Sequence, residues 1–116
     1  MVSVFINQLT LTAIVASEVE CRQTKSEKTV GTFNVSIPTV RDEETTWESF
    51  QVEVWNGTAE ACSTYLTKGS KVLIQGVLKQ ARWETDSGTR SRVYIRANLV
   101  EFIRLKDPAE PQSDEY

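Results

Sequence analysis

An alternation of apolar and polar side chains runs along most of this chain and restricts its fold more than any other feature. Residues on one face of a β-strand recur with a period of two, so apolar side chains at every second position indicate a strand that covers a core. Leu9, Leu11, Ala13 and Val15 show this period near the start of the chain. The pattern predicts five strands, in residues 8–15, 32–37, 47–55, 71–83 and 91–103.

The connections between these segments have the composition of loops and turns. The polar run "QTKSEKTVG" (residues 23–31) predicts a hairpin loop, and Pro38 is expected to end the second strand. The acidic run "RDEETT" (41–46) is expected to be a loop, and "TDSG" (85–88) a turn between the last two strands.

A single helix is expected between the third and fourth strands. The segment "TAEACSTYLTKG" (58–69) places apolar residues at helical spacing, Thr58 or Asn56 could cap its start, and Gly69 suits a left-handed cap at its end. Five strands with one helix in this position is the element order of the OB-fold, a five-stranded Greek-key barrel that binds oligonucleotides or oligosaccharides on one face. The expected fold class is therefore all-β.

Length and charge predict one domain with a basic second half. The chain has 116 residues, and its net charge of −3 is unevenly distributed. Residues 1–60 carry four basic and nine acidic side chains, whereas residues 61–105 carry eight basic and three acidic ones. Residues 1–105 are expected to form the domain, and the proline-interrupted acidic run 106–116 is expected to be a disordered tail.

The composition disfavours enzymes, metal sites and membrane proteins. The chain has no histidine, its two cysteines are 41 positions apart, and no phosphate-binding glycine loop or nucleophile motif occurs. We expect no catalytic residue, no metal and no cofactor. Two free thiols, no signal peptide and no apolar run of ~20 residues predict a cytoplasmic protein without a membrane partner.

The strand phases place aromatic rings and cations on the wet face of the sheet. If Phe50, Val52 and Val54 point inward, Trp47 and Trp55 must point outward. The same argument applied to the last two strands brings further rings and cations outward. The candidate binding residues are Trp47, Trp55, Lys79, Arg82, Trp83, Arg90, Arg92, Tyr94 and Arg96. Flat rings beside cations suit single-stranded nucleic acid, whose bases stack while its phosphates are neutralised.

The run "VEVWNGTAEACSTYLTKGSKVLIQGVLKQARWETDSGTRSRVYIRANLVEFI" (52–103) resembles the second half of bacterial single-stranded DNA-binding proteins. The resemblance implies binding of single-stranded DNA without strong sequence preference, and protection of that DNA during replication, recombination and repair. It implies that Trp55 and Trp83 stack on bases. It also implies a homo-oligomer, usually a tetramer, associated with the bacterial nucleoid.

Several positions depart from the family pattern. Val40 and Ser49 stand where many members carry stacking aromatics, and Glu53 lies on the proposed face, where it would repel phosphates. Trp47 is a candidate substitute for the ring missing at Ser49. The tail lacks the family's terminal "PF", although its acidic end could still dock replication or repair proteins.

Other interpretations stay open at this stage. Trp47 could cap the end of the barrel, Tyr94 could lie at a subunit contact, and the arginines could form an ordinary solvated strand face. At the level of the whole protein, the alternatives are a primosome-type accessory protein with the same barrel and a protein-interaction module that binds no nucleic acid.

Overall fold

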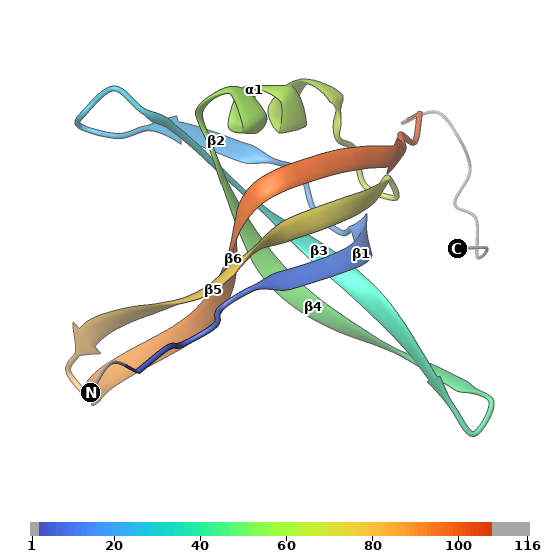
Figure 1. Cartoon of the computed structure of the whole chain (residues 1–116), viewed down its shortest axis with the longest axis horizontal. Helices are drawn as coiled ribbons and strands as arrows, with labels where there is room; N and C mark the ends of the chain where they lie inside the picture. The colour runs from blue at the N-terminus through green and yellow to red at the C-terminus, as the bar shows by residue number, and fades with distance from the viewer. Residues whose placement is uncertain (1–2, 108–116) are drawn as a thin grey trace.

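Six strands pair into one sheet that closes into a ring (Figure 1), within residues 3–107, which are the part of the chain that the computed structural model describes. The strand order is β1-β5-β6-β4-β3-β2, and an additional pairing of β1 with β3 closes the ring. Strands β4 and β6 run parallel, and the other pairs are antiparallel. The elements are β1 (Leu9–Val15), β2 (Glu20–Gln23), β3 (Thr29–Arg41), β4 (Glu44–Trp55), α1 (Asn56–Tyr65), β5 (Lys71–Thr85) and β6 (Gly88–Arg104).

The predicted all-β class with one helix is confirmed, and β2 is an element that the sequence pattern did not predict. Its four residues, "ECRQ", are all exposed and show no alternation of apolar side chains. They nevertheless pair with Thr29–Thr32 of β3, which makes β2 the edge of the sheet. The predicted hairpin loop lies between these two strands.

The expected end of the second strand at Pro38 and the expected loop over 41–46 are both wrong. Strand β3 continues to Arg41 and β4 begins at Glu44, so the connection is only Asp42 and Glu43. Both have positive φ, 53° and 66°, as a type I′ hairpin turn requires. Pro38 is tolerated because β1 pairs with β3 no further than Ser36, which leaves an open edge where a missing N–H costs no ladder bond.

Two long hairpins extend from the ring in different directions (Figure 1). We call them the β3–β4 arm and the β5–β6 arm. The second one begins where β1 stops pairing with β5, at Gly76. Phe50 has the inward phase that the sequence predicted, and Leu78 has the phase of the buried Val72 and Ile74. They are nevertheless 39% and 50% exposed, because they lie where the strands leave the closed sheet.

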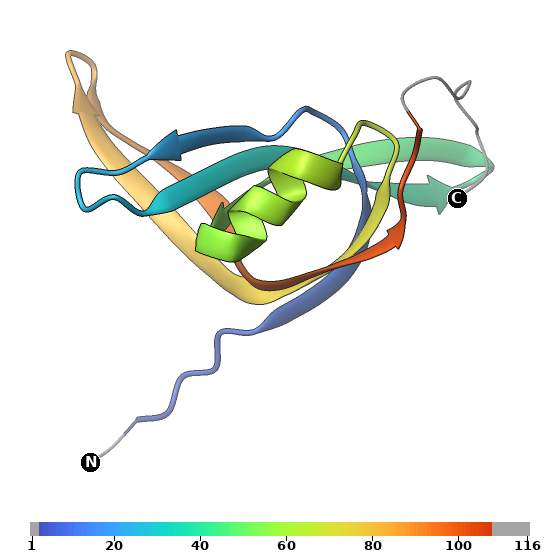
Figure 2. The ribbon, with the colours of Figure 1, turned by 90° about the horizontal axis from the view of Figure 1, so that it is seen from above.

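Helix α1 covers one end of the ring and completes the core (Figure 2). Its Ala59 and Cys62, with Leu66 just after it, join the strand side chains in one buried cluster. The strand members of that cluster are Ala13, Val15, Phe33, Val35, Val52, Val54, Val72, Ile74 and Ile95. The buried phases of β4 and β5 are therefore those predicted from the alternation.

The ends of the helix differ from the expected ones. The helix begins at Asn56, directly after β4, and no side chain caps it, so neither Thr58 nor Asn56 has the predicted role. Gly69 does have a positive φ of 94°, but it lies in the turn from Thr67 to Ser70 and its N–H donates to the carbonyl of Val15. It therefore joins that turn to β1 instead of ending the helix.

A bulge on β6 shifts the phase of its last residues. Gly76 lies opposite Ala97 while Gln75 lies opposite Leu99, so Asn98 is an extra residue on β6. An uninterrupted alternation from the buried Ile95 predicts that Leu99 points inward, but the extra residue makes Leu99 an exposed residue on the outer side of the sheet. Gly76 permits the close approach here, because a Cβ at this position would lie 2.1 Å from the carbonyl oxygen of Arg96.

The chain returns to the ring after β6 through Lys106, which is only 8% exposed. Its backbone N–H donates to Ser70 Oγ at 3.0 Å, and the Thr67 hydroxyl donates to its carbonyl. Ordered packing thus reaches the first residue of the segment expected to be a tail. Residues 108–116 of the expected disordered tail lie outside the described residues.

Candidate nucleic-acid interface

Six of the nine candidate residues lie on one face of the β5–β6 hairpin. Residues directly opposite each other in an antiparallel pair share a face. The register places Trp83 opposite Arg90, and Lys79 opposite Tyr94. Arg92 and Arg96 lie on the same face, because they are opposite Ala81 and Val77. This surface therefore carries two pairs of a ring beside a cation and two further arginines along the length of the arm.

Trp55 joins this surface through the parallel pairing of β4 with β6. Glu53 of β4 is opposite Arg96, and Trp55 is two residues further along the same face. The guanidinium carbon of Arg96 lies 5.4 Å from the centroid of the Trp55 ring, within the range of a cation–π contact. We call the set the aromatic–cationic face; its members are Trp55, Lys79, Trp83, Arg90, Arg92, Tyr94 and Arg96.

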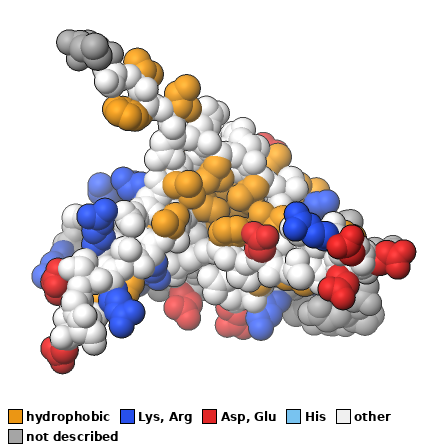
Figure 3. Space-filling model, turned by 90° about the horizontal axis from the view of Figure 1, so that it is seen from below, with side chains coloured by type: hydrophobic (Ala, Val, Ile, Leu, Met, Phe, Trp, Pro, Cys, Tyr) orange, Lys and Arg blue, Asp and Glu red, His pale blue; other side chains and the backbone are white. Residues whose placement is uncertain are grey.

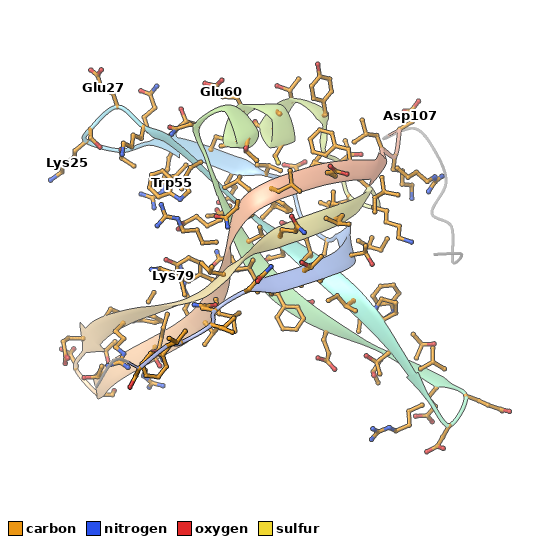
Figure 4. All side chains as sticks on the ribbon, in the orientation of Figure 1. Lys25, Glu27, Trp55, Glu60, Lys79 and Asp107 are labelled. Atoms are coloured by element: carbon orange, nitrogen blue, oxygen red, sulfur yellow. The ribbon has the colours of Figure 1, made fainter. Side chains whose placement is uncertain are left out.

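The face extends from Trp55 along the β5–β6 arm. In Figure 4, Trp55 and Lys79 are on the same side of the molecule, with the β2–β3 hairpin that carries Lys25 above them and Lys79 on the β5–β6 arm itself. Seen from below, Lys and Arg side chains gather over the β5–β6 arm, whereas acidic side chains gather at the end of the β3–β4 arm (Figure 3). The acidic total charge of the chain therefore does not describe this part of its surface.

The structure does not bring Arg82 to the aromatic–cationic face. Arg82 lies opposite Ser91, on the other face of the same arm. Its Nε and Nη2 donate to Gln80 Oε1 at 3.3 and 3.0 Å. Because Arg82 directly precedes Trp83 in the strand, and successive side chains point to opposite faces, Arg82 points away from the face that carries Trp83.

Trp47 has the outward phase of Trp55 but lies far from it. Trp55 is eight positions after Trp47 in the strand, which corresponds to about 26 Å along β4. Trp47 is opposite Pro38 on the β3–β4 arm, which diverges from the β5–β6 arm (Figure 1). Val40 and Ser49 lie on the same side of that arm as Trp47, since they are opposite Thr45 and Ser36. Trp47 thus supplies a ring on the surface where those two positions lack one.

The sequence reasoning missed Arg22, which the pairing of β2 brings near Trp55. Arg22 is opposite Val30, and Val30 is opposite Trp55, so the three residues form a row across three strands. Two strand spacings correspond to about 10 Å. The sequence gives no sign that Arg22 lies near Trp55, because this proximity depends on the pairing of an exposed four-residue strand in the acidic first half of the chain.

The acidic side chains and the two cysteines of residues 3–107 are the candidates for metal or thiol chemistry. Nowhere in this range do three or more His, Cys, Asp or Glu side chains gather as a metal site. Cys21 is exposed and Cys62 is buried, and burial, with a smaller effect of the nearby Cys21 thiol, raises the pKa of Cys62 to about 11. Such a thiol stays protonated at neutral pH and is a poor nucleophile. Helix α1, with its 10 residues, is too short to cross a membrane, and no other described helix could.

Comparisons with known proteins agree on one family. Residues 6–103 match the family model described as "Single-strand binding protein family". A single-stranded DNA-binding protein of Thermotoga maritima is 34% identical over 116 residues, covering 95% of this chain and 82% of the relative. Single-stranded DNA-binding protein 1 of a Synechocystis species is 33% identical over 117 residues, covering 96% of this chain and 95% of the relative.

The fold also agrees with a solved structure. The Plasmodium falciparum SSB in its complex with ssDNA superposes with a TM-score of 0.75, covering 92% of this chain and all of that chain. The two sequences are 21% identical, so this likeness concerns the fold alone. It confirms the OB-fold that the element order predicted.

Proposed function

Because this chain belongs to the single-strand binding protein family, we propose that it binds single-stranded DNA on the aromatic–cationic face with little preference for base sequence. The cross-strand register carries the proposal, because it sets Trp83 beside Arg90 and Tyr94 beside Lys79 on one surface. Bases stack on the rings, at about 1–3 kcal/mol per base, and the neighbouring cations neutralise phosphates.

The proposed contacts do not distinguish one base from another. Every base offers a flat face to Trp55 and Trp83, and the phosphates that meet Arg90, Arg92 and Arg96 are the same in every nucleotide. In this proposal the protein covers and protects single-stranded DNA during replication, recombination and repair, at the bacterial nucleoid in the cytoplasm. It acts as a binding protein and not as a catalyst.

Titration with oligo-dT tests the proposal through the fluorescence of the three tryptophans. We expect strong quenching, and an affinity that falls as salt rises because each neutralised phosphate releases counterions. Double-stranded DNA of the same length is the control, since its bases cannot stack on the rings. Unchanged fluorescence at low salt with micromolar protein, together with no shift in a gel, would overturn the proposal in favour of a protein-interaction module.

We propose further that the protein is a homo-oligomer, a tetramer as the family resemblance implies. Apolar side chains on the outer side of the sheet support this, because Leu73 and Val77 are only half-buried and Leu99 is exposed. Val4, Phe5 and Ile6 are 83–90% exposed in the segment before β1. Light scattering should give a particle of four times the chain mass of 13.1 kDa. A particle of about 13 kDa at high concentration would refute this part.

Residues 106–116 are proposed to serve as a docking segment for replication or repair proteins. Their acidic composition and the terminal Tyr116 support this, although the "PF" ending of many family members is missing. Pull-down of a replication or repair protein by the full chain, and not by a chain ending at Asp107, is the expected result. Equal capture by both chains would refute the docking role.

A further inference from the structure

The indole of Trp55 is held by two neighbouring side chains. Its Nε1–H donates a hydrogen bond of 2.7 Å to Glu53 Oε1, which is a short, charge-assisted contact. The guanidinium of Arg96 lies over the ring, 5.4 Å from its centroid. The edge of the ring is thus fixed by one residue of β4, and one of its faces is covered by a residue of β6.

The strand geometry makes this arrangement specific to the three residues. Glu53 and Trp55 share a face of β4 because they are two positions apart, and Glu53 is opposite Arg96 in the parallel pair. An acidic residue at this position would otherwise be unfavourable, since it lies on a surface that is proposed to meet phosphates. The hydrogen bond gives the carboxylate a role that its charge alone does not explain.

Glu20 is an acidic residue on the same surface that does not accept the hydrogen bond from Trp55. Glu20 is opposite Thr32, and Thr32 is opposite Glu53, so the two carboxylates lie in one row about 10 Å apart. They carry the same charge, but the indole of Trp55 donates only to Glu53. Glu20 is therefore a matched control for the charge of Glu53.

We propose that Glu53 is a positioning residue that holds the Trp55 ring in the orientation in which a base stacks on the face opposite Arg96. This inference rests on the proposed function, because it assumes that Trp55 meets a base. A ring that is already fixed loses less side-chain freedom when DNA binds, and ordering one side chain at an interface changes affinity about two- to tenfold.

The test uses a parent variant in which Trp55 is the only tryptophan, made by Trp47→Phe and Trp83→Phe. In this parent, Glu53→Gln removes the charge but keeps an oxygen acceptor, whereas Glu53→Ala removes both. The ratio of their oligo-dT affinities therefore isolates the hydrogen bond from the charge. Glu20→Gln and Glu20→Ala give the corresponding ratio at a carboxylate that does not touch the indole.

We expect Glu53→Ala to bind oligo-dT about two- to tenfold more weakly than Glu53→Gln at every salt concentration, and the two Glu20 variants to bind equally. Time-resolved fluorescence anisotropy of the free proteins should show a more mobile Trp55 in Glu53→Ala than in Glu53→Gln. Glu53→Asp keeps the charge on a shorter side chain, so it should also release the ring. This variant serves if Glu53→Ala fails to fold.

Each other outcome overturns a defined part. Equal affinity and equal anisotropy for Glu53→Ala and Glu53→Gln would show that Glu53 does not position the ring, even while DNA quenches Trp55. If both Glu53 variants bind more tightly than the parent by the same factor as both Glu20 variants, Glu53 is only a repulsive charge. If the parent shifts oligo-dT in a gel without quenching, Trp55 meets no base and the inference fails while DNA binding stands. If no DNA is shifted, the proposed function fails.

Discussion

Arg92 and Arg82 provide the sharpest test of which face binds DNA. Both are exposed arginines on the β5–β6 arm, and the register places them on opposite faces, Arg92 opposite Ala81 and Arg82 opposite Ser91. Arg82 also binds Gln80 with its guanidinium. Substituting either by alanine removes one positive charge from the same arm, so any difference between the two variants reports the face and not the charge.

The expected magnitude follows from the number of phosphates that each arginine meets. One phosphate neutralised on a single strand contributes about 0.7 to the slope of log affinity against log salt. Arg92→Ala should reduce the slope by about this amount if it contacts one phosphate. With equal affinities extrapolated to 1 M salt, that loss corresponds to about eightfold weaker binding at 50 mM and about threefold at 200 mM. Arg82→Ala should change the slope by less than half as much, through long-range attraction alone.

The assay is a series of oligo-dT titrations at several salt concentrations, followed by tryptophan fluorescence. Thermal unfolding of both variants is the control, because two exposed arginines on an arm should leave the melting temperature unchanged. A slope that falls as much for Arg82→Ala as for Arg92→Ala would refute the face assignment. In that case DNA would lie on the other side of the arm or wrap around it.

Three substitutions and two deletions test the remaining parts. Trp83→Ala should weaken oligo-dT binding by about 1–3 kcal/mol with the salt slope intact; loss of folding would instead show that Trp83 is a packing residue. Gly76→Ala should destabilise the fold by about 1–3 kcal/mol, seen as a melting temperature at least ~4 °C lower, because its Cβ would meet β6 backbone at 2.1 Å. Gly57→Ala has open space around it and should not lower the melting temperature. Deleting residues 108–116 should leave the melting temperature within ~4 °C, whereas a deletion that includes Lys106 should lower it further; equal melting temperatures would mean that the contacts of Lys106 do not stabilise the domain.

The sequence predicts the strands of the closed sheet well, because burial imposes the apolar period of each strand. Val52 and Val54 in β4, and Val72 and Ile74 in β5, are all fully buried, as their alternation indicates. The outward direction of Trp55 follows from the same period, since a strand with one buried face leaves its other face to solvent. These predictions need only local pattern, which is why they hold without knowledge of the partners of each strand.

The features that the sequence did not predict depend on pairing or on single residues. Strand β2 has no apolar period, so its place beside β3, and with it the position of Arg22, follows only from the closed sheet. The bulge at Asn98 adds one residue to β6 and turns Leu99 outward, and one extra residue leaves no trace in composition. Pro38 suggests the end of a strand, but the open edge of β3 at that point, which only the pairing of the strands reveals, lets the strand continue.

Glu53 shows why charge alone was a poor guide to the site. In the sequence, Glu53 counts against phosphate binding because it is an acidic residue on the proposed face, and the pairing of β2 brings a second acid, Glu20, to that face. In the structure only Glu53 accepts the indole N–H of Trp55, because it stands two positions from the ring on the same strand face. Two glutamates on one surface therefore differ in their role, because only Glu53 makes the 2.7 Å contact with the indole of Trp55.

Trp47 leads to a last prediction, about the length of DNA that the protein covers. Its ring lies about 26 Å along β4 from Trp55 and on an arm that diverges from the arm of Trp83. The register puts Trp83 about 26 Å from Trp55 along the diverging β5–β6 arm, so an oligo-dT just long enough to span Trp55 and Trp83 does not also reach Trp47, and Trp47→Ala should leave its affinity unchanged. Longer oligo-dT should reveal a loss of about 1–3 kcal/mol for Trp47→Ala, while the loss for Trp83→Ala stays constant with length. A Trp47→Ala effect that is equal for all lengths would mean that the ring acts on folding or assembly and not as a stacking surface.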